Sequence, residues 1–248
     1  MPEAALYLST RSFWKKNFPR TWVLASGIAA LLAIPRFIFM LQGNTNYVLI
    51  LFAVMWFIPT LLLNRTGRKQ IGITTPHRAR WLTLGFPLGI AAALMLHYIG
   101  YALFDRSRDN WFITIMNSFN SNDIIQSIGH NLLFFLVFAL PTMIFSPIGE
   151  EFFYRGIMHE AFLEKFGSRA AVLANASFFG VTHLAHHGLV IQPRLEVLPS
   201  AVLWIILMML ISVLFSVIRK KSGSIWGAVF CHAGFNLGMM WSIFYLLN

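Results

Sequence analysis

The chain has 248 residues, of which 57% are hydrophobic and 11% are charged, and its formal net charge is +10. A soluble domain carries roughly a quarter charged residues, so this composition excludes an ordinary water-soluble fold. Apolar runs long enough to cross a hydrocarbon layer of ~30 Å recur along the chain. They predict an all-α, polytopic transmembrane helical bundle. The single cysteine, Cys231, excludes an internal disulfide framework.

Residues 1–20 form a basic N-terminal segment that is predicted to lie at the membrane surface as an interfacial helix. It combines Phe13 and Trp14 with four basic residues, Arg11, Lys15, Lys16 and Arg20. The apolar run that follows is too long for a signal peptide and has no small-residue cleavage site at its end. We therefore expect this run to be retained as the first membrane helix.

Residues 21–248 are predicted to form one transmembrane domain with seven membrane helices. The predicted spans are 21–42, 47–63, 81–104, 128–156, 170–187, 200–218 and 224–247. Segment 105–126 is rich in charged and turn-forming residues around the apolar stretch 111–116, and we expect an interfacial or re-entrant loop on the outer side. Counting that stretch would give eight membrane segments.

Basic residues concentrate in alternate loops between the predicted spans. One set of loops contains 15 of the 19 lysines and arginines. The positive-inside rule then predicts a cytoplasmic N-terminus and an outer C-terminus. This pattern explains the high net charge by membrane orientation, so membrane lipid is the expected partner and nucleic acid is not.

Ionisable groups within membrane spans are costly and are therefore functional candidates. The candidates, together with two amides on apolar helices, are Arg36, His97, His130, Glu150, Glu151, Arg155, Asn175, His183, His186, His187, His232 and Asn236.

The first motif consists of Glu150, Glu151 and Arg155 at the end of an apolar run. On a helix Glu151 and Arg155 are four residues apart with the acid first, which favours an ion pair. Glu150 points ~100° away around the helix and is free to face a cavity as a general base. The alternative is a helix start that is rich in charge and has no catalytic role.

Two further motifs place histidines on apolar helices. Phe179 precedes His183 by four residues, and His232 precedes Asn236 by the same spacing, next to small residues that permit close helix packing. Taken singly, His183 is more easily explained as a hydrogen-bonded core residue than as a catalyst, and helix packing also explains His232 and Asn236.

The predicted depths of these residues bring them together. If Gly167 is the turn of a helical hairpin, Glu150 and His183 lie at matching heights on its two arms, and His232 lies about 15 Å from its own basic helix end. A carboxylate, two imidazoles and an amide at one level predict a catalytic core within about 127–248, in the cytoplasmic half of the bilayer.

The three motifs resemble those of the CAAX-protease and bacteriocin-processing family of intramembrane peptidases, also called type II CAAX prenyl endopeptidases or the ABI family. The resemblance covers about 145–240 and implies an intramembrane endopeptidase that acts on a membrane-associated peptide or protein. It also implies roles for the motif residues. Glu150 and His183 would activate a water, His232 and Asn236 would stabilise the oxyanion, and Glu151, Arg155 and Phe179 would support them.

A metal is left open by the residue types. Glu150, His183 and His232 supply the N and O ligands of a catalytic Zn²⁺, with water as the fourth ligand. The same residues can also hydrolyse a peptide without metal, and the spacing does not distinguish the two.

The remaining polar residues are interpreted as non-catalytic. His186 and His187 are expected at the outer interface, Arg36 is expected to snorkel or bind lipid, and His97 and His130 are expected to be hydrogen-bonded packing residues. The alternative function is a non-catalytic membrane protein, either a small-solute transporter or an immunity-type scaffold, since buried Glu and His also build proton relays.

Overall fold

The computed structural model describes residues 8–118, 132–191 and 194–247, and the predicted helical bundle is confirmed. Five helices of the described chain are long and apolar enough to cross a membrane. The helical elements are α1 (Ser12–Asn17), α2 (Thr21–Leu41), α3 (Thr45–Leu62), α4 (Arg65–Gln70), α5 (Arg80–Phe104), α6 (Trp111–Ser118), α8 (Leu132–Glu150), η1 (Glu151–Met158), α9 (His159–Thr182), η2 (His183–Ala185), α10 (Ala201–Ser222), α11 (Ile225–Trp241) and η3 (Ser242–Leu246).

Five of the seven predicted spans coincide with single described segments to within a few residues: α2, α3, α5, α10, and α11 with η3. The other two spans are the two arms of one long helical stretch, Leu132–Ala185. Its α-helical geometry is interrupted at Gly167, which has φ 81° and ψ 173°. Only glycine adopts such a conformation without strain. The predicted turn at Gly167 is confirmed, although residues 128–131 of the predicted fourth span lie outside the described residues.

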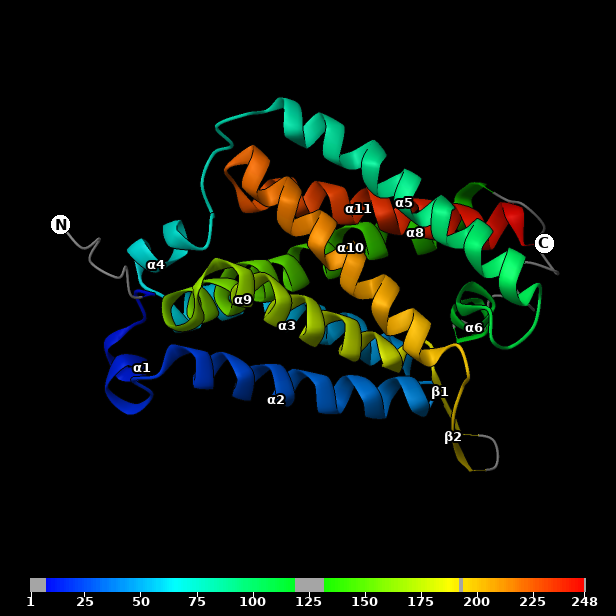
Figure 1. Ribbon diagram of the computed structural model, residues 1–248, viewed down its shortest axis with the longest axis horizontal. Helices are drawn as coiled ribbons and strands as arrows, with labels where there is room; N and C mark the ends of the chain where they lie inside the picture. Colours follow the sequence, from blue (N-terminus) through cyan, green and yellow to red (C-terminus); the bar gives the residue numbers. More distant parts are fainter. Residues whose placement is uncertain (1–7, 119–131, 192–193, 248) are drawn as a thin grey trace.

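The two ends of the bundle differ in their secondary structure. α1 and α4 lie at one end, and α6 and a small β-hairpin lie at the other (Figure 1). The hairpin pairs β1 (Leu189–Ile191) with β2 (Leu195–Val197) in antiparallel register. It was not predicted, and the fifth predicted span was too long, because α9 ends at Thr182 and a short 3₁₀ turn follows.

Segment 105–126 contributes a short buried helix to the end of the bundle that carries the hairpin. Trp111 and Phe112 of α6 are fully buried, and the Trp111 ring stacks on that of Trp204 at 5.7 Å. The predicted interfacial or re-entrant segment is thus a helix that packs on the membrane helices; residues 119–126 lie outside the described part.

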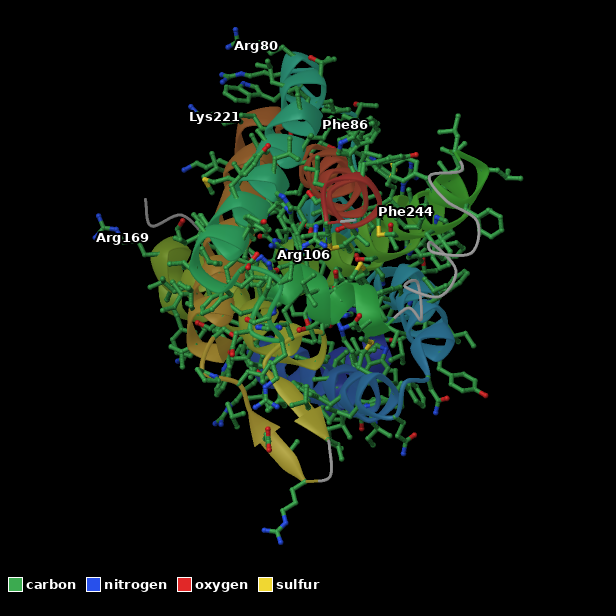
Figure 2. All side chains as sticks on the ribbon, turned by 90° about the vertical axis from the view of Figure 1, so that its right-hand side faces the viewer. Arg80, Phe86, Arg106, Arg169, Lys221 and Phe244 are labelled. Atoms are coloured by element: carbon green, nitrogen blue, oxygen red, sulfur yellow. The ribbon has the colours of Figure 1, made fainter. Side chains whose placement is uncertain are left out.

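The outer surface of the bundle is apolar between its two ends. Leu31, Leu133 and Val202 have exposed fractions of 70%, 65% and 66%, which a bilayer covers and water does not. Figure 2, viewed from the end that carries α6, shows the basic side chains Arg80, Arg169 and Lys221 projecting away from the helices. This distribution is that of a multi-pass membrane protein.

Close packing of α5 against α11 brings the third motif into the core. A Cβ atom added to Gly234 would lie 2.0 Å from the carbonyl oxygen of Phe86, so only glycine fits there. The predicted role of small residues near His232 is therefore confirmed, and this contact holds the helix that carries His232 and Asn236.

Candidate active site

A cavity of about 290 Å³ lies among α2, α3, α8, α10 and α11, and it brings the motif residues together. Its polar lining comes from Arg36, Thr142, Ser146, His183, His186, His232 and Asn236. The remaining lining residues are apolar, and one of them, Val137, is 57% exposed on the side of α8. The cavity therefore reaches the membrane-facing surface beside α8.

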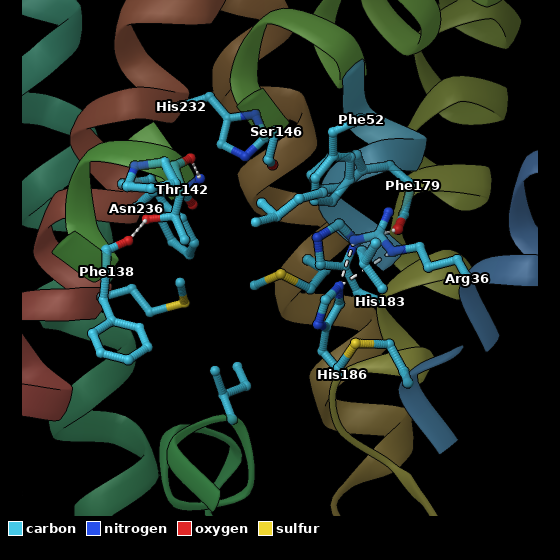
Figure 3. Close-up of a pocket in the computed structure, with 18 of the residues that line it drawn as sticks. Arg36, Phe52, Phe138, Thr142, Ser146, Phe179, His183, His186, His232 and Asn236 are labelled. Atoms are coloured by element: carbon cyan, nitrogen blue, oxygen red, sulfur yellow. Dashed lines mark hydrogen bonds between the residues drawn. The ribbon is translucent and has the colours of Figure 1, made fainter. Parts of the chain in front are cut away.

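The polar groups occupy two sides of the cavity (Figure 3). Asn236 and Thr142 lie on one side and Arg36, His183 and His186 on the other, while His232 and Ser146 lie between them. A ligand that fills the cavity would contact both groups at once.

Glu150 lies behind the polar wall of this cavity, at the end of α8, and its exposed fraction is 0%. Its Oε1 accepts a hydrogen bond from Arg36 Nη1 at 2.5 Å, and its Oε2 accepts one from Ser146 Oγ at 2.8 Å. The Nε2 atom of His232 is 3.7 Å from Oε2. Ser146 stands one helical turn before Glu150, and its part in the site was not predicted.

Glu151 makes the predicted ion pair with Arg155, at 3.0 Å, and both side chains are fully buried. The same Oε1 atom accepts a hydrogen bond from Nδ1 of His232 at 2.8 Å. Glu151 is therefore more than the counter-ion of Arg155, because it also orients one of the site histidines.

Phe179 supports this ion pair through its ring face. The Arg155 guanidinium lies 4.1 Å from the centroid of Phe179 and 5.0 Å from that of Phe215, distances at which a cation is attracted by an aromatic ring. Phe215 also stacks on the His232 ring at 4.7 Å. Its contribution from α10 was not predicted, since a phenylalanine on a membrane helix carries no sequence signal of its own.

His183 is held at the C-terminal end of α9 by its own helix. Its Nδ1 atom is 2.7 Å from the carbonyl oxygen of Phe179, so it is the protonated ring nitrogen and donates to that oxygen. The backbone carbonyl of His183 accepts a hydrogen bond from Trp204 Nε1 at 2.9 Å. These contacts leave Nε2 as a hydrogen-bond acceptor on the cavity side.

His232 and Asn236 are one turn apart on α11 and both line the cavity. With Nδ1 of His232 bound to Glu151, its Nε2 atom is the one available to a ligand. Asn236 Nδ2 donates to the carbonyl oxygen of Thr142 at 2.7 Å, and an amide nitrogen carries two protons. One N–H of Asn236 is thereby fixed, and this orients the second.

Arg36 was wrongly expected to snorkel or bind lipid. Its side chain is 5% exposed, pairs with Glu150, and contacts His186 Nε2 through Nη2 at 2.6 Å. Arg36 lies inside the bundle because the buried Glu150 carboxylate needs a cation, and the residues of α8 provide none.

His186 and His187 follow the end of α9, as expected, but their side chains point into the bundle and not to the interface. His186 lines the cavity beside Arg36. His187 is fully buried, with Nε2 2.8 Å from Ser200 Oγ and Nδ1 3.0 Å from Thr114 Oγ1. Asp109 completes this second network by accepting from Ser200 Oγ at 2.9 Å. Burial lowers the pKa of His187 to about 4, although the Asp109 carboxylate acts in the opposite direction.

Three other polar candidates lie apart from the cavity or outside the described chain. Asn175 bonds to Ala171 and Ser212 within the helix packing. His97 is buried against Phe112, but its Nδ1 atom has no hydrogen-bond partner among the described residues, so the expectation of a hydrogen-bonded side chain was wrong. His130 lies outside the described residues.

The proposed zinc ligands do not form a metal site in this arrangement. Within the described ranges, no three His, Cys, Asp or Glu side chains are grouped closely enough to hold a metal ion. Glu150 Oε1 is bound by the Arg36 guanidinium. We therefore derive no catalytic step through a metal.

Comparison with known families finds a match in the part of the chain that carries these residues. Residues 132–238 match the model of the type II CAAX prenyl endopeptidase Rce1-like family. The match contains all three motifs and confirms the resemblance inferred from them. No curated protein and no solved structure matches the chain.

Proposed function

We propose that this membrane protein, whose residues 132–238 match the Rce1-like family of type II CAAX prenyl endopeptidases, is an intramembrane endopeptidase with Glu150 as its general base. The observation that carries the proposal is the cavity in which His183, His232 and Asn236 converge next to the buried Glu150 carboxylate. Peptide hydrolysis needs a base for water and donors for the developing oxyanion, and these residues supply both.

Glu150 accepts a proton from the attacking water in this mechanism. His183, whose Nδ1 atom is fixed on the Phe179 carbonyl, orients that water through Nε2. The proton that Glu150 receives is then available to the leaving amine, as for other general acid–base catalysts. Because the cavity is largely apolar, these electrostatic interactions are stronger than they would be in water.

The oxyanion of the tetrahedral intermediate is stabilised from the opposite side of the cavity. Asn236 offers the N–H that its bond to Thr142 leaves free. His232 donates through Nε2 when the ring carries both protons, with Glu151 holding Nδ1. Removal of one such donor typically lowers kcat by about 10²- to 10³-fold, and we expect this of Asn236→Ala.

The substrate is a membrane-associated peptide or protein that enters beside α8, where Val137 lines the cavity and is exposed. Met40, Val48 and Ile115 line the cavity near the end of the bundle that carries α6, so the predicted orientation places this part of the cavity away from the cytoplasmic loops. The family match favours the peptidase over the transporter and over the immunity-type scaffold.

A variant of Glu150 tests the proposal. The purified full chain should cleave a dye-labelled peptide that ends in a prenylated cysteine and three further residues, and Glu150→Gln should lose about 10²- to 10⁴-fold of that activity. Glu160→Gln is the matched control, because Glu160 pairs with Arg219 away from the cavity. Comparative proteomics of cells with the wild-type and Glu150→Gln proteins then identifies natural substrates. Wild-type turnover by a folded Glu150→Gln protein would refute the assignment of Glu150.

A further inference from the structure

A second cavity, of about 620 Å³, lies at the end of the bundle that carries α4. Its walls come from the end of α4 and the loop that follows it, from α9, and from the C-terminal half of α10, the elements seen toward that end in Figure 1. It shares no lining residue with the candidate active site. Any ligand of the second cavity therefore binds apart from the catalytic groups.

The lining of the second cavity is basic. Among the described residues it contains Lys69, Arg219 and Lys220, and no aspartate or glutamate. Both lysines are exposed, and neither has an ion-pair partner within the described ranges. Two positive charges at one cavity without counter-ions favour an anionic ligand.

Arg219 is the cation of this lining that the protein already holds in place. Its Nη2 atom donates to Glu160 Oε1 at 2.8 Å and to the carbonyl oxygen of Ile71 at 3.2 Å, and its side chain is 15% exposed. Both bonds use one nitrogen, and a guanidinium carries five N–H donors on three nitrogens. Arg219 can therefore donate to a ligand through Nη1 or Nε without leaving Glu160.

The part of the second cavity nearer the middle of the bundle is apolar. Val172 of α9 and Val213 and Val217 of α10 line it, and Val217 is 44% exposed. Leu210, which is 60% exposed, lies three and seven residues before those two valines and so on the same face of α10. An apolar strip thus continues from the cavity onto the surface that the bilayer covers.

The order of these groups along α10 matches the layers of a bilayer. α10 ends at Ser222, so Lys220 lies about 3 Å and Val213 about 13 Å from the helix end at a rise of 1.5 Å per residue. The polar layer on each side of the hydrocarbon core is roughly 5–8 Å thick. The basic groups are therefore at the depth of lipid headgroups, and the valines are at the depth of acyl chains.

We propose that the second cavity binds a phosphate group, and that this phosphate belongs to the headgroup of an anionic phospholipid in the adjoining leaflet. Basic pockets between membrane helices bind such headgroups. The phosphate accepts charge-assisted hydrogen bonds from Lys69, Lys220 and Arg219, and an acyl chain follows Val217 toward Leu210. A free phosphate would use the basic groups alone, whereas a lipid also covers the apolar strip.

Native mass spectrometry of the full chain, released from detergent micelles, tests this assignment. The protein is titrated with phosphatidylglycerol, with phosphatidylcholine and with inorganic phosphate. Each basic residue near an anionic lipid strengthens binding about fivefold, so the first phosphatidylglycerol should bind roughly 10- to 30-fold more tightly than phosphatidylcholine. Inorganic phosphate at the same concentration should not displace it.

Two double variants and one single variant locate the preference. Lys69→Gln/Lys220→Gln removes the two cations without counter-ions and should reduce the preference to about threefold or less. Lys15→Gln/Lys16→Gln is the matched control, because these exposed lysines lie on α1 at the same end and outside the cavity. It should keep the preference. Glu150→Gln should also keep it, since the binding does not depend on peptide hydrolysis.

Each contrary result has a definite meaning. Equal binding of the two lipids by the wild-type protein would overturn the proposal, and so would a preference that persists in Lys69→Gln/Lys220→Gln. An equal loss in Lys15→Gln/Lys16→Gln would assign the preference to the general surface charge and overturn the cavity as its site. Displacement of the lipid by inorganic phosphate would overturn the phospholipid as the source of the phosphate.

Discussion

The buried pair of Glu151 and Arg155 makes a sharp prediction about stability. Both side chains have exposed fractions of 0%, and Glu151 Oε1 is the atom on which Arg155 and His232 converge. Glu151→Gln removes the negative charge and leaves the guanidinium buried without a counter-ion, a change that typically costs about 3–5 kcal/mol. Since the rings of Phe179 and Phe215 still face Arg155, we expect a loss of about 3 kcal/mol, near the lower end of that range.

The double variant Glu151→Gln/Arg155→Met should recover most of this loss. The double variant removes both charges. It also replaces or neutralises three polar atoms that lack hydrogen-bond partners among the described residues, namely Glu151 Oε2, Arg155 Nε and Arg155 Nη2. Replacement of a buried ion pair by neutral side chains of similar volume is often close to neutral in stability. The coupling energy between the two positions should therefore be about 2–3 kcal/mol.

Unfolding of the purified protein in mixed detergent micelles measures both quantities. Glu160→Gln is the control, because its pair with Arg219 is partly exposed, with side-chain fractions of 15% and 20%. It should cost about 1 kcal/mol or less. Additive losses in the double variant, or a Glu151→Gln protein as stable as the control, would contradict the argument from burial.

Three more outcomes are expected. Cysteine labelling in intact cells should place residues near 68 and 220 in the cytoplasm and Asn44 outside; labelling of position 220 from outside would reverse the orientation. Elemental analysis of active protein purified with a chelator should find well under one zinc per chain, since Glu150 Oε1 is bound by Arg36 and not left free for a metal. Stoichiometric zinc that is lost in His183→Ala and His232→Ala would require a metal-bound arrangement. The pKa of His187 is about 4 in the folded protein and near 6.5 in the unfolded chain. The contribution of His187 to the free energy of unfolding should therefore be fully present above pH 6.5 and fall by at most about 3 kcal/mol as the pH approaches 4. An equally steep fall in His187→Gln would assign this loss to other groups.

The sequence alone predicted the helix bounds, one ion pair and one turn, all of which depend on residues close together in the chain. Apolar length predicted where α2, α3 and α5 begin and end, because a helix must match the bilayer that surrounds it. The four-residue spacing of Glu151 and Arg155 predicted their ion pair, and Gly167 predicted the turn between the two arms. Each of these follows from helix geometry or backbone sterics within a few residues.

The tertiary structure alone decided which distant groups meet. Arg36 pairs with Glu150 across 114 positions of sequence, and His187 bonds to Ser200 and Thr114 from other elements. A charged residue in a predicted membrane helix indicates that it has a partner inside the bundle. The sequence does not identify that partner, because several carboxylates and imidazoles are predicted at similar depths. The choice among them depends on how the helices rotate and pack, and this is why the residue that covers the candidate base was identified only in the folded protein.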